Sequence, residues 1–326
     1  MNTEHIDIDL ARYSDWAFTS SVVVLVTALL LLAVELAYSR GRKVEARELV
    51  GAATAATFGP GAKVGADSAT PGVVAAEPKR PLDERTGKAG LALVYVGIGL
   101  LAVCIVLRGL ATARVPWGNM YEFINLTCFS GLVAGAIVLR RPQYRALWVF
   151  VLVPVLILLT VSGRWLYTNA APVMPALQSY WLPIHVSVVS LGSGVFLVAG
   201  VASILFLLKM YLPDNAFVQR LPDAQTLDRI AYRTTIFAFP VFGFGVIFGA
   251  IWAEEAWGRY WGWDPKETVS FIAWVVYAAY LHARSTAGWR DRKAAWINVV
   301  GFVAMVFNLF FINLVTVGLH SYAGVG

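Results

Sequence analysis

Long runs of apolar residues dominate the chain, and short polar or Gly- and Pro-marked breaks separate them. Within the runs the apolar positions follow a helical period or no period, rather than the strict alternation of a β-barrel strand. A helix needs roughly 20 mainly apolar residues to cross the hydrocarbon core of a bilayer. Eight stretches qualify and predict an all-α, polytopic membrane protein: residues 16–38, 89–107, 122–139, 146–162, 183–210, 234–252, 268–282 and 294–316.

The basic residues between these stretches indicate how the eight predicted helices are oriented. With the N-terminus outside, the inner segments are 39–88, 140–145, 209–233 and 283–293, and they hold 20 of the 26 lysines and arginines. The outer segments hold the other six. This asymmetry follows the positive-inside rule. The sequence therefore predicts a plasma-membrane protein whose N- and C-termini both lie on the outer face.

The first predicted helix and the polar segment after it stand apart from the rest of the chain. The flank before residue 16 is acidic, whereas a cleavable signal peptide begins with basic residues, so residues 1–38 are predicted to hold a retained transmembrane helix. Residues 39–88 are polar and rich in Ala, Gly, Thr and Pro, without an apolar face. Such a segment predicts a flexible cytoplasmic linker. Residues 89–326 then form a seven-helix body.

The composition agrees with a membrane protein and narrows its chemistry. The 326 residues are 58% hydrophobic and 14% charged, with a mean hydropathy of +0.66, whereas a soluble domain carries about 25% charged residues. The topology accounts for the net charge of +6, so no nucleic-acid partner is needed. The two cysteines form no C-x-x-C or C-x-x-C-H, which excludes a thioredoxin-like centre and a c-type cytochrome.

The segment 252–267, which we call the tryptophan loop, links two predicted helices on the outer face. It has an ordinary interpretation, because Trp and Tyr gather where a helix meets the membrane–water interface. Asp264, Pro265 and Glu267 are also typical of a helix start, with Asp264 as the N-cap. If capping were the main role of Asp264, Asp264→Asn would be milder than Asp264→Ala, because Asn also caps well.

The density of aromatic residues favours a second interpretation, in which the loop binds a flat molecule. Three tryptophans and a tyrosine lie within residues 257–263, and glycines at 258 and 262 would let a planar object approach the backbone. The aromatic residues of this platform are Trp252, Trp257, Tyr260, Trp261 and Trp263.

Two of the four histidines lie on the same predicted face as the tryptophan loop. His185 is at the outer mouth of the helix 183–210, and His320 follows the helix 294–316. A flat aromatic surface beside two imidazoles is typical of a haem site, because haem iron takes axial imidazole. Arg259 and Lys266 are close enough in sequence to meet haem propionates. Zinc is the alternative, but a zinc site wants three or four protein ligands and leaves the tryptophans unexplained.

The motif "WGRYWGWD" is similar to the tryptophan-rich WWD signature of haem-handling proteins. The order of motifs resembles the CcsA (ResC) family of cytochrome c biogenesis proteins: "WLPIHV" before the loop, "YLHARSTAGW" after it, and "GLHSY" beyond the last helix. "PWGNMYEF" at 116–123 is also similar to the family. The resemblance covers roughly residues 90–323.

The resemblance implies that the chain binds haem b and presents it on the outer face. With a CcsB (ResB) partner, such a protein attaches haem to the C-x-x-C-H motif of apocytochromes c, as a component of a holocytochrome c synthase. His185 and His320 would be the external axial ligands. The WWD platform would comprise Trp257, Trp261, Trp263 and Asp264, with Trp252 and Arg259 beside it as further haem-binding residues.

His282 would match the membrane-embedded histidine of the family. It lies roughly 21 Å inward from residue 268 at 1.5 Å per residue, which is too far to share an iron at the outer face. A lone histidine in a membrane helix can also simply bond a neighbouring helix. With the resemblance, we expect His282 to be a possible ligand of an inner haem iron whose opposite ligand comes from the CcsB-like partner.

Two other functions fit parts of the sequence. A membrane electron-transfer subunit with haem b would place pairs of histidines within facing helices, but here only His282 lies within a predicted span. A transporter of haem or of another small solute would use intramembrane carboxylates. Glu35 and Glu122 lie near helix ends rather than at mid-span.

Overall fold

The computed structural model describes residues 6–58, 82–173, 177–313 and 315–320 of the chain, and the regular elements in these ranges are helices. Short 3₁₀ helices, Pro142–Leu147 and Val218–Arg220, lie in two of the connections. The α-helices are α1 Ile8–Phe58, α2 Leu82–Ala111, α3 Met120–Val138, α4 Trp148–Trp165, α5 Trp181–Tyr211, α6 Ala224–Trp257, α7 Pro265–Ser285 and α8 Arg292–Phe307, and α8 continues into the π-helix η4, Asn308–Ile312. The predicted all-α class is confirmed.

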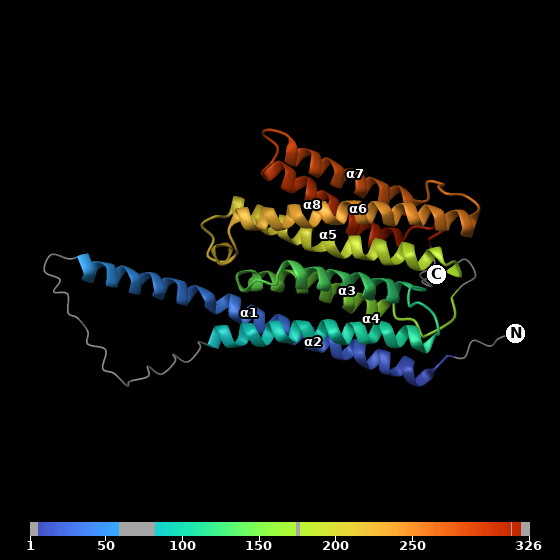
Figure 1. Ribbon diagram of the computed structural model, residues 1–326, viewed down its shortest axis with the longest axis horizontal. Helices are drawn as coiled ribbons and strands as arrows, with labels where there is room; N and C mark the ends of the chain where they lie inside the picture. The colour runs from blue at the N-terminus through green and yellow to red at the C-terminus, as the bar shows by residue number, and fades with distance from the viewer. Residues whose placement is uncertain (1–5, 59–81, 174–176, 314, 321–326) are drawn as a thin grey trace.

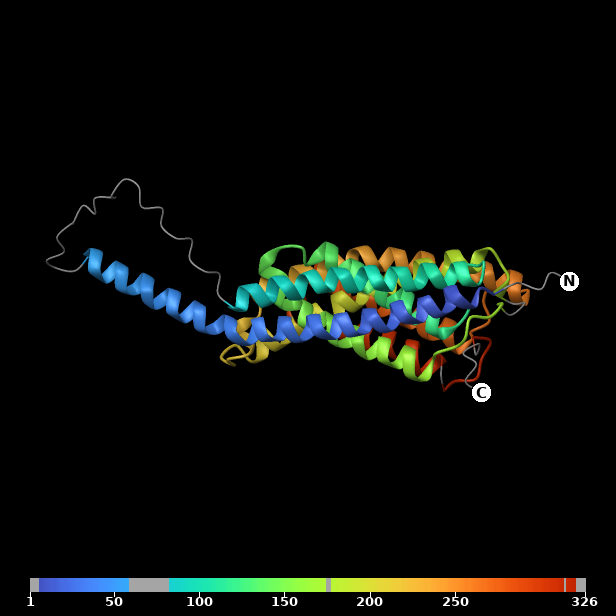
Figure 2. The same cartoon turned by 90° about the horizontal axis from the view of Figure 1, so that it is seen from below.

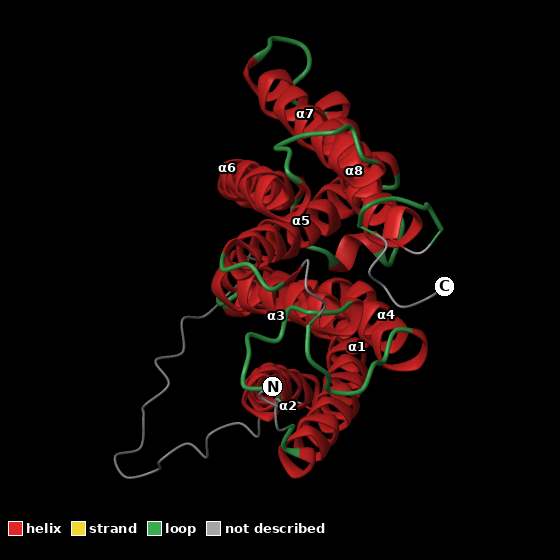
Figure 3. Ribbon diagram, turned by 90° about the vertical axis from the view of Figure 1, so that its right-hand side faces the viewer, coloured by secondary structure: helices red, strands yellow, loops and turns green. Residues whose placement is uncertain are grey.

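The helices lie side by side as neighbouring pairs, α1 with α2, α3 with α4, α5 with α6 and α7 with α8 (Figures 1 and 3). Helix α5 is the centre of the bundle, with 78% of its most apolar window buried against its neighbours. The core consists of aliphatic and aromatic side chains, among them Phe196, Leu205 and Phe242. A central helix that is apolar on all sides is expected only where other helices surround it.

Glycines allow α5 to pack closely against α3. A Cβ atom on Gly194 would lie 2.4 Å from the backbone nitrogen of Gly131, so only hydrogen fits there. In membranes, small residues at such crossings bring two backbones into van der Waals contact. This contact fixes α5, and hence the residues at its start, against α3.

Seven helices are long and apolar enough to cross a membrane among the residues that the structure describes. They correspond to the predicted spans except 268–282, which lies in α7. Helix α7 has 21 residues, about 31 Å at 1.5 Å per residue, so its length would suffice. It packs along α8 and α6 within the bundle, and the crossing of α7 stays a prediction.

The connections α2–α3, α4–α5 and α6–α7 meet at one end of the bundle, together with the start of α1 and residues 315–320 (Figures 1 and 3). This is the set of segments that the sequence assigns to the outer face. We call it the outer end from here on, while the side of the membrane that it faces remains the prediction made from the charges.

The structure differs from the expected linker at both of its ends. Helix α1 continues through Phe58 and extends past the bundle, and α2 begins at Leu82 (Figure 2). The stretch 44–57 is rich in Ala and also contains Glu45, Glu48 and Leu49, residues of high helix propensity, and this explains its continuation as helix. The middle of the expected linker, 59–81, lies outside the described residues.

Candidate functional site

The tryptophan loop is a tight connection between two capped helices. Helix α6 ends at Trp257, and Gly258 follows in the left-handed conformation with φ of 71°. Its N–H donates to the carbonyl of Glu254 at 2.7 Å, the usual way of ending a helix on glycine. At the other end of the loop, Asp264 is the N-cap of α7.

Glu267 closes the capping box at the start of α7. Its Oε2 accepts from the backbone N–H of Asp264 at 3.1 Å and from that of Gly262 at 2.9 Å. The Asp264 carboxylate accepts from the N–H of Lys266 in return, at 3.3 Å. The helix start predicted from the sequence is therefore present, and it also holds the loop backbone at Gly262.

Asp264 makes its shorter hydrogen bonds to the segment after α8 rather than to its own helix. Oδ2 lies 2.8 Å from Nδ1 of His320, and Oδ1 accepts from the N–H of Leu319 at 2.8 Å. Burial alone would raise the pKa of the Asp264 carboxyl, but the hydrogen bonds from His320 and Leu319 lower it below its ordinary value. The ionised carboxylate thus ties His320 to the tryptophan loop.

His185 lies in the second turn of α5 and is held by α6. Its Nδ1 lies 2.8 Å from the carbonyl oxygen of Gly245. One turn along α6, a Cβ on Gly249 would lie 2.6 Å from Cε1 of His185, so glycine makes room for the ring. The imidazole is thus placed by a hydrogen bond on one side and by the absence of a side chain on the other.

The two imidazoles share one tautomer. A carbonyl oxygen and an ionised carboxylate can only accept, so Nδ1 carries the proton in both His185 and His320. The lone pair of each ring is then on Nε2. Histidines that ligate metals are oriented in this way, with the other ring nitrogen donating to a carbonyl or a carboxylate.

One indole contacts both histidines. Trp252 is buried, with 2% of its surface exposed. His185 stacks on it with ring centroids 6.1 Å apart and an interplanar angle of 4°, and His320 meets it edge-on at 5.9 Å. Trp257 packs edge-on against both Trp252 at 4.7 Å and His320 at 5.0 Å. These two tryptophans support the imidazoles.

A cavity of about 340 Å³ opens beside the two imidazoles. His185, His320 and Trp261 line it at the outer end, polar residues lie at the start of α7, and mostly apolar residues of α3, α4, α5, α6 and α8 line the remainder. The volume falls within the range of about 300–1,000 Å³ that is usual for small-molecule and cofactor sites. An apolar cavity with two convergent imidazoles suits a flat, apolar metal complex.

Three other candidate residues, Trp263, Arg259 and His282, do not lie beside the two imidazoles. Trp263 is 67% exposed and adopts a positive φ of 57°, with its ring edge-on to Trp261 at 5.7 Å. The guanidinium of Arg259 lies against the Cα of Gly262. His282 is exposed near the far end of α7, so the structure does not bring it near the other two histidines.

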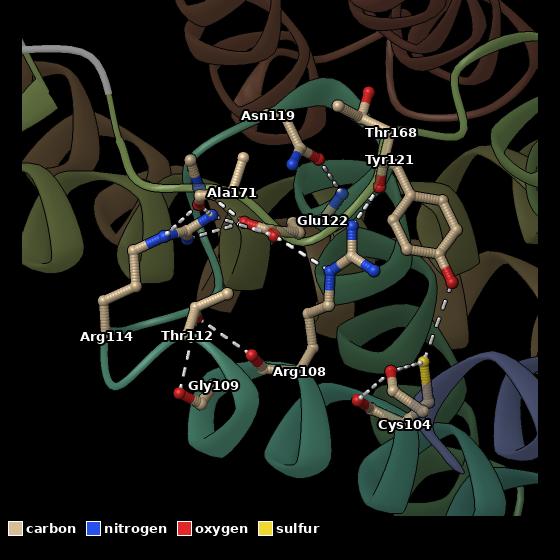
Figure 4. A network of polar contacts seen from close by, with 12 residues as sticks. Cys104, Arg108, Gly109, Thr112, Arg114, Asn119, Tyr121, Glu122, Thr168 and Ala171 are labelled. Atoms are coloured by element: carbon tan, nitrogen blue, oxygen red, sulfur yellow. Dashed lines mark hydrogen bonds and ion pairs between the residues drawn. The ribbon is translucent and has the colours of Figure 1, made fainter. Parts of the chain in front are cut away.

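A buried ionic network lies at the connection between α2 and α3, and it was not predicted from the sequence (Figure 4). Glu122 accepts from Nη1 of Arg114 at 2.9 Å, from Nε of Arg108 at 3.3 Å and from the N–H of Gly118 at 2.7 Å. Arg108 is 1% exposed and Glu122 is 3% exposed. The network thereby fixes the turn before α3.

That turn reaches the helix that carries His185. The indole N–H of Trp117 donates to the carbonyl of Pro183 at 3.1 Å and to Oγ of Ser187 at 2.7 Å, one on each side of His185 along α5. The motif "PWGNMYEF" therefore serves to hold the start of α5. Its only signal in the sequence was the resemblance of this motif to the family.

Comparisons with known proteins agree with this architecture. The family model described as Cytochrome C assembly protein matches residues 117–320, from Trp117 to His320. The cytochrome c biogenesis protein CcsA of Guillardia theta is 35% identical over 258 residues, which cover 70% of this chain and 85% of the relative. CcsA of Synechococcus sp. (strain CC9902) is 34% identical over 274 residues, covering 74% and 88%. This chain belongs to the CcsA family.

As a CcsA-family member, the chain is a multi-pass membrane protein of cytochrome c biogenesis, as the resemblance implied. A solved structure named Cytochrome c Heme Lyase CcmF is similar in fold, with a TM-score of 0.62 and 16% sequence identity. The match covers 92% of this chain and 46% of that one, so the helical arrangement makes up about half of the larger protein.

Proposed function

We propose that this CcsA-family protein holds haem b at its outer end and presents it to apocytochromes c. Nε2 of His185 and Nε2 of His320 are the axial ligands in this proposal. The observation that carries it is the matched hydrogen bonding of the two rings, in which each Nδ1–H donates to a fixed acceptor beside one apolar cavity.

Haem is the substrate in this proposal rather than a resident cofactor. Bound haem supplies two vinyl groups, and the cysteine thiols of a C-x-x-C-H motif add across them to form thioethers. The chain's own residues bind and orient the macrocycle, and the exposed indole of Trp263 offers a surface on which an apocytochrome can dock. A CcsB-like membrane protein completes the holocytochrome c synthase, with the haem facing the outside of the plasma membrane.

The two carboxylates that a proton-coupled transporter would use are engaged in ion pairs. Glu35 accepts from Nε of Arg145 at 2.8 Å, and Glu122 lies in the network with Arg108 and Arg114. Because both carboxylates are held in ion pairs, they do not favour a proton-coupled transporter. Haem is the ligand that the outer end suits best. Among the described residues, His282 is the single histidine besides the two at the cavity, so facing pairs of ligands for electron transfer are not found there.

The test compares His185→Gly, His320→Gly and the control His282→Gly in the purified chain. The first two are expected to lose haem or the low-spin spectrum, and added imidazole is expected to restore it by filling the vacant axial position. His282→Gly is expected to keep the outer-end spectrum. Wild-type spectra in both cavity variants would refute the ligation.

His282 belongs to a second, partner-dependent site in this proposal. Its exposure on α7 leaves it accessible to another membrane protein. We expect its opposite axial ligand to be a histidine of the CcsB-like partner. His282→Ala should therefore lower the haem content of the two-protein complex and leave that of the isolated chain unchanged. Equal haem loading of the wild-type and variant complexes would exclude this site.

A further inference from the structure

The cavity has one polar corner, formed where α7 begins and α8 ends. Nζ of Lys266 donates to Oδ1 of Asn313 at 2.8 Å and lies 3.4 Å from the carbonyl oxygen of Asn308. Nδ2 of Asn308 donates to Oγ of Ser270 at 2.8 Å. Lys266, Glu267, Ser270 and Asn308 line the cavity at this corner, and the other walls are mostly apolar.

The ammonium of Lys266 donates to neutral groups, and the Asp264 carboxylate acts on it only from a longer distance. Its partners Asn308 and Asn313 are 5% and 6% exposed, and the ring of Phe123 lies 5.8 Å from Nζ. In the described part of the chain, no carboxylate oxygen lies within 4.0 Å of Nζ. A buried charge is costly unless an opposite charge meets it, so this position favours an anion brought in by a ligand.

The nearest carboxylates are already engaged elsewhere. Both oxygens of Asp264 bond to the segment 319–320, and Oε2 of Glu267 accepts from two backbone N–H groups of the loop. Asn308, the first residue of the π-helix η4, provides its carbonyl to Lys266. The corner therefore holds the lysine in place without neutralising it.

We infer that Lys266 receives one propionate carboxylate of haem inside the cavity. This inference rests on the proposed function, and it separates two cations that the sequence leaves equivalent. Lys266 lines the cavity, whereas Arg259 packs against Gly262 in the loop and does not line it.

A cation at this corner would fix the rotation of the macrocycle about its axial direction, which two axial ligands leave free. Two imidazoles fix the iron and the normal to the macrocycle, but they allow the ring to rotate about the axis through them. A cation that lies off that axis selects the edge bearing the carboxylates, and so determines where the vinyl edges point. Thioether formation at a defined vinyl requires this kind of fixed orientation.

The test uses haem and haem dimethyl ester, which share the iron, the macrocycle and the vinyls but differ in carboxylate charge. The full chain, purified in detergent, is titrated with each, and the ratio of the two Kd values is measured. We expect the wild type to prefer the free acid at least tenfold. Lys266→Gln keeps the hydrogen-bond donors and removes the charge, so it should reduce the ratio to about one, whereas Arg259→Gln should leave it unchanged.

Asn313→Asp provides an independent variant with the lysine intact. It places a carboxylate on the atom that Nζ already contacts at 2.8 Å and so neutralises the ammonium, although it also removes the bonds that Nδ2 of Asn313 donates to the carbonyls of Leu309 and Asn308. The preference for the free acid should again disappear. A wild type without preference, or a preference that survives both Lys266→Gln and Asn313→Asp, would overturn the inference. Haem ligation by His185 and His320 is read separately from the spectrum, so failure of the proposed function is distinguishable.

Discussion

Replacing Asp264 by asparagine tests two roles that the structure gives to one side chain. The residue caps α7 and also accepts from Nδ1 of His320, and Oδ2 makes both contacts. On capping alone this substitution would be milder than Asp264→Ala, because asparagine also caps well. The amide, however, presents one oxygen and one NH₂ group. With the oxygen held by the N–H of Leu319, the NH₂ takes the place of Oδ2 and faces both His320 and the N–H of Lys266.

An NH₂ group opposite Nδ1 reverses the tautomer of His320. Nδ1 then has to accept, so the proton moves to Nε2, and the nitrogen that would bind iron loses its available lone pair. A hydrogen bond to a charged group is worth about 1.5–3 kcal/mol, and loss of such an outer-shell partner typically lowers metal affinity about 10- to 100-fold. Asn and Asp are nearly equivalent as N-caps, whereas Ala costs about 0.5–2 kcal/mol.

The expected result is therefore a loss of haem affinity that capping alone does not explain. Asp264→Asn should weaken haem binding about 10- to 100-fold, more than Asp264→Ala, which leaves His320 free to adopt either tautomer. Both substitutions lose the Oδ2 bond to the N–H of Lys266 and should lower the thermal midpoint of the haem-free chain. Haem affinity is measured by absorbance titration and the midpoint by circular dichroism in the same detergent.

Free imidazole provides the control, because it can choose its own tautomer. In a His320→Gly background with added imidazole, Asp264→Asn should cost much less than it does in the presence of His320. Asp264→Asn with wild-type haem affinity, beside a defective Asp264→Ala, would show that capping is the role that matters and would refute the tautomer explanation.

Three further predictions follow from packing and exposure. Gly249→Ala should reduce haem retention as strongly as His185→Gly, because the new Cβ would lie 2.6 Å from the ring, while the control Gly99→Ala, with open space around it, should behave as the wild type in the same absorbance assay. Glu122→Gln removes the carboxylate that pairs with the buried Arg108 and the half-buried Arg114, and should destabilise the chain by about 3–5 kcal/mol in denaturant unfolding; an unchanged unfolding midpoint would contradict this. Trp263→Ala should keep haem affinity and slow covalent attachment to an apocytochrome, measured as haem that resists acid–acetone extraction, and equal attachment rates would argue against docking at this indole.

The sequence predicted the helical class, the convergence of four segments at one end and the proximity of two histidines to the tryptophan loop. These features follow from apolar length and from charge asymmetry, both of which are local properties of the chain. The partners of the histidines were not predictable. The carbonyl of Gly245 lies 60 residues from His185 and Asp264 lies 56 residues from His320, and no periodic pattern encodes such pairs.

The different environments of the tryptophans were likewise not predictable from the sequence pattern. Trp252 and Trp257 are buried beside the imidazoles, Trp261 lines the cavity and Trp263 is exposed, although all four looked equivalent as members of one motif. The direction in which a loop side chain points depends on backbone conformation, and here Gly258 and Trp263 both adopt left-handed conformations. The extension of α1 through 39–58 was missed because an absent apolar face was given more weight than helix propensity.

The left-handed backbone at Trp263 implies a conflict between thermal stability and activity at that position. A bulky residue at φ of 57° carries a conformational penalty that glycine would not. Random mutagenesis followed by selection for heat resistance alone should therefore enrich Gly or Asn at 263, whereas selection for cytochrome yield should retain the indole. Natural variants are expected to tolerate this penalty as long as the rest of the bundle keeps the protein above its stability threshold.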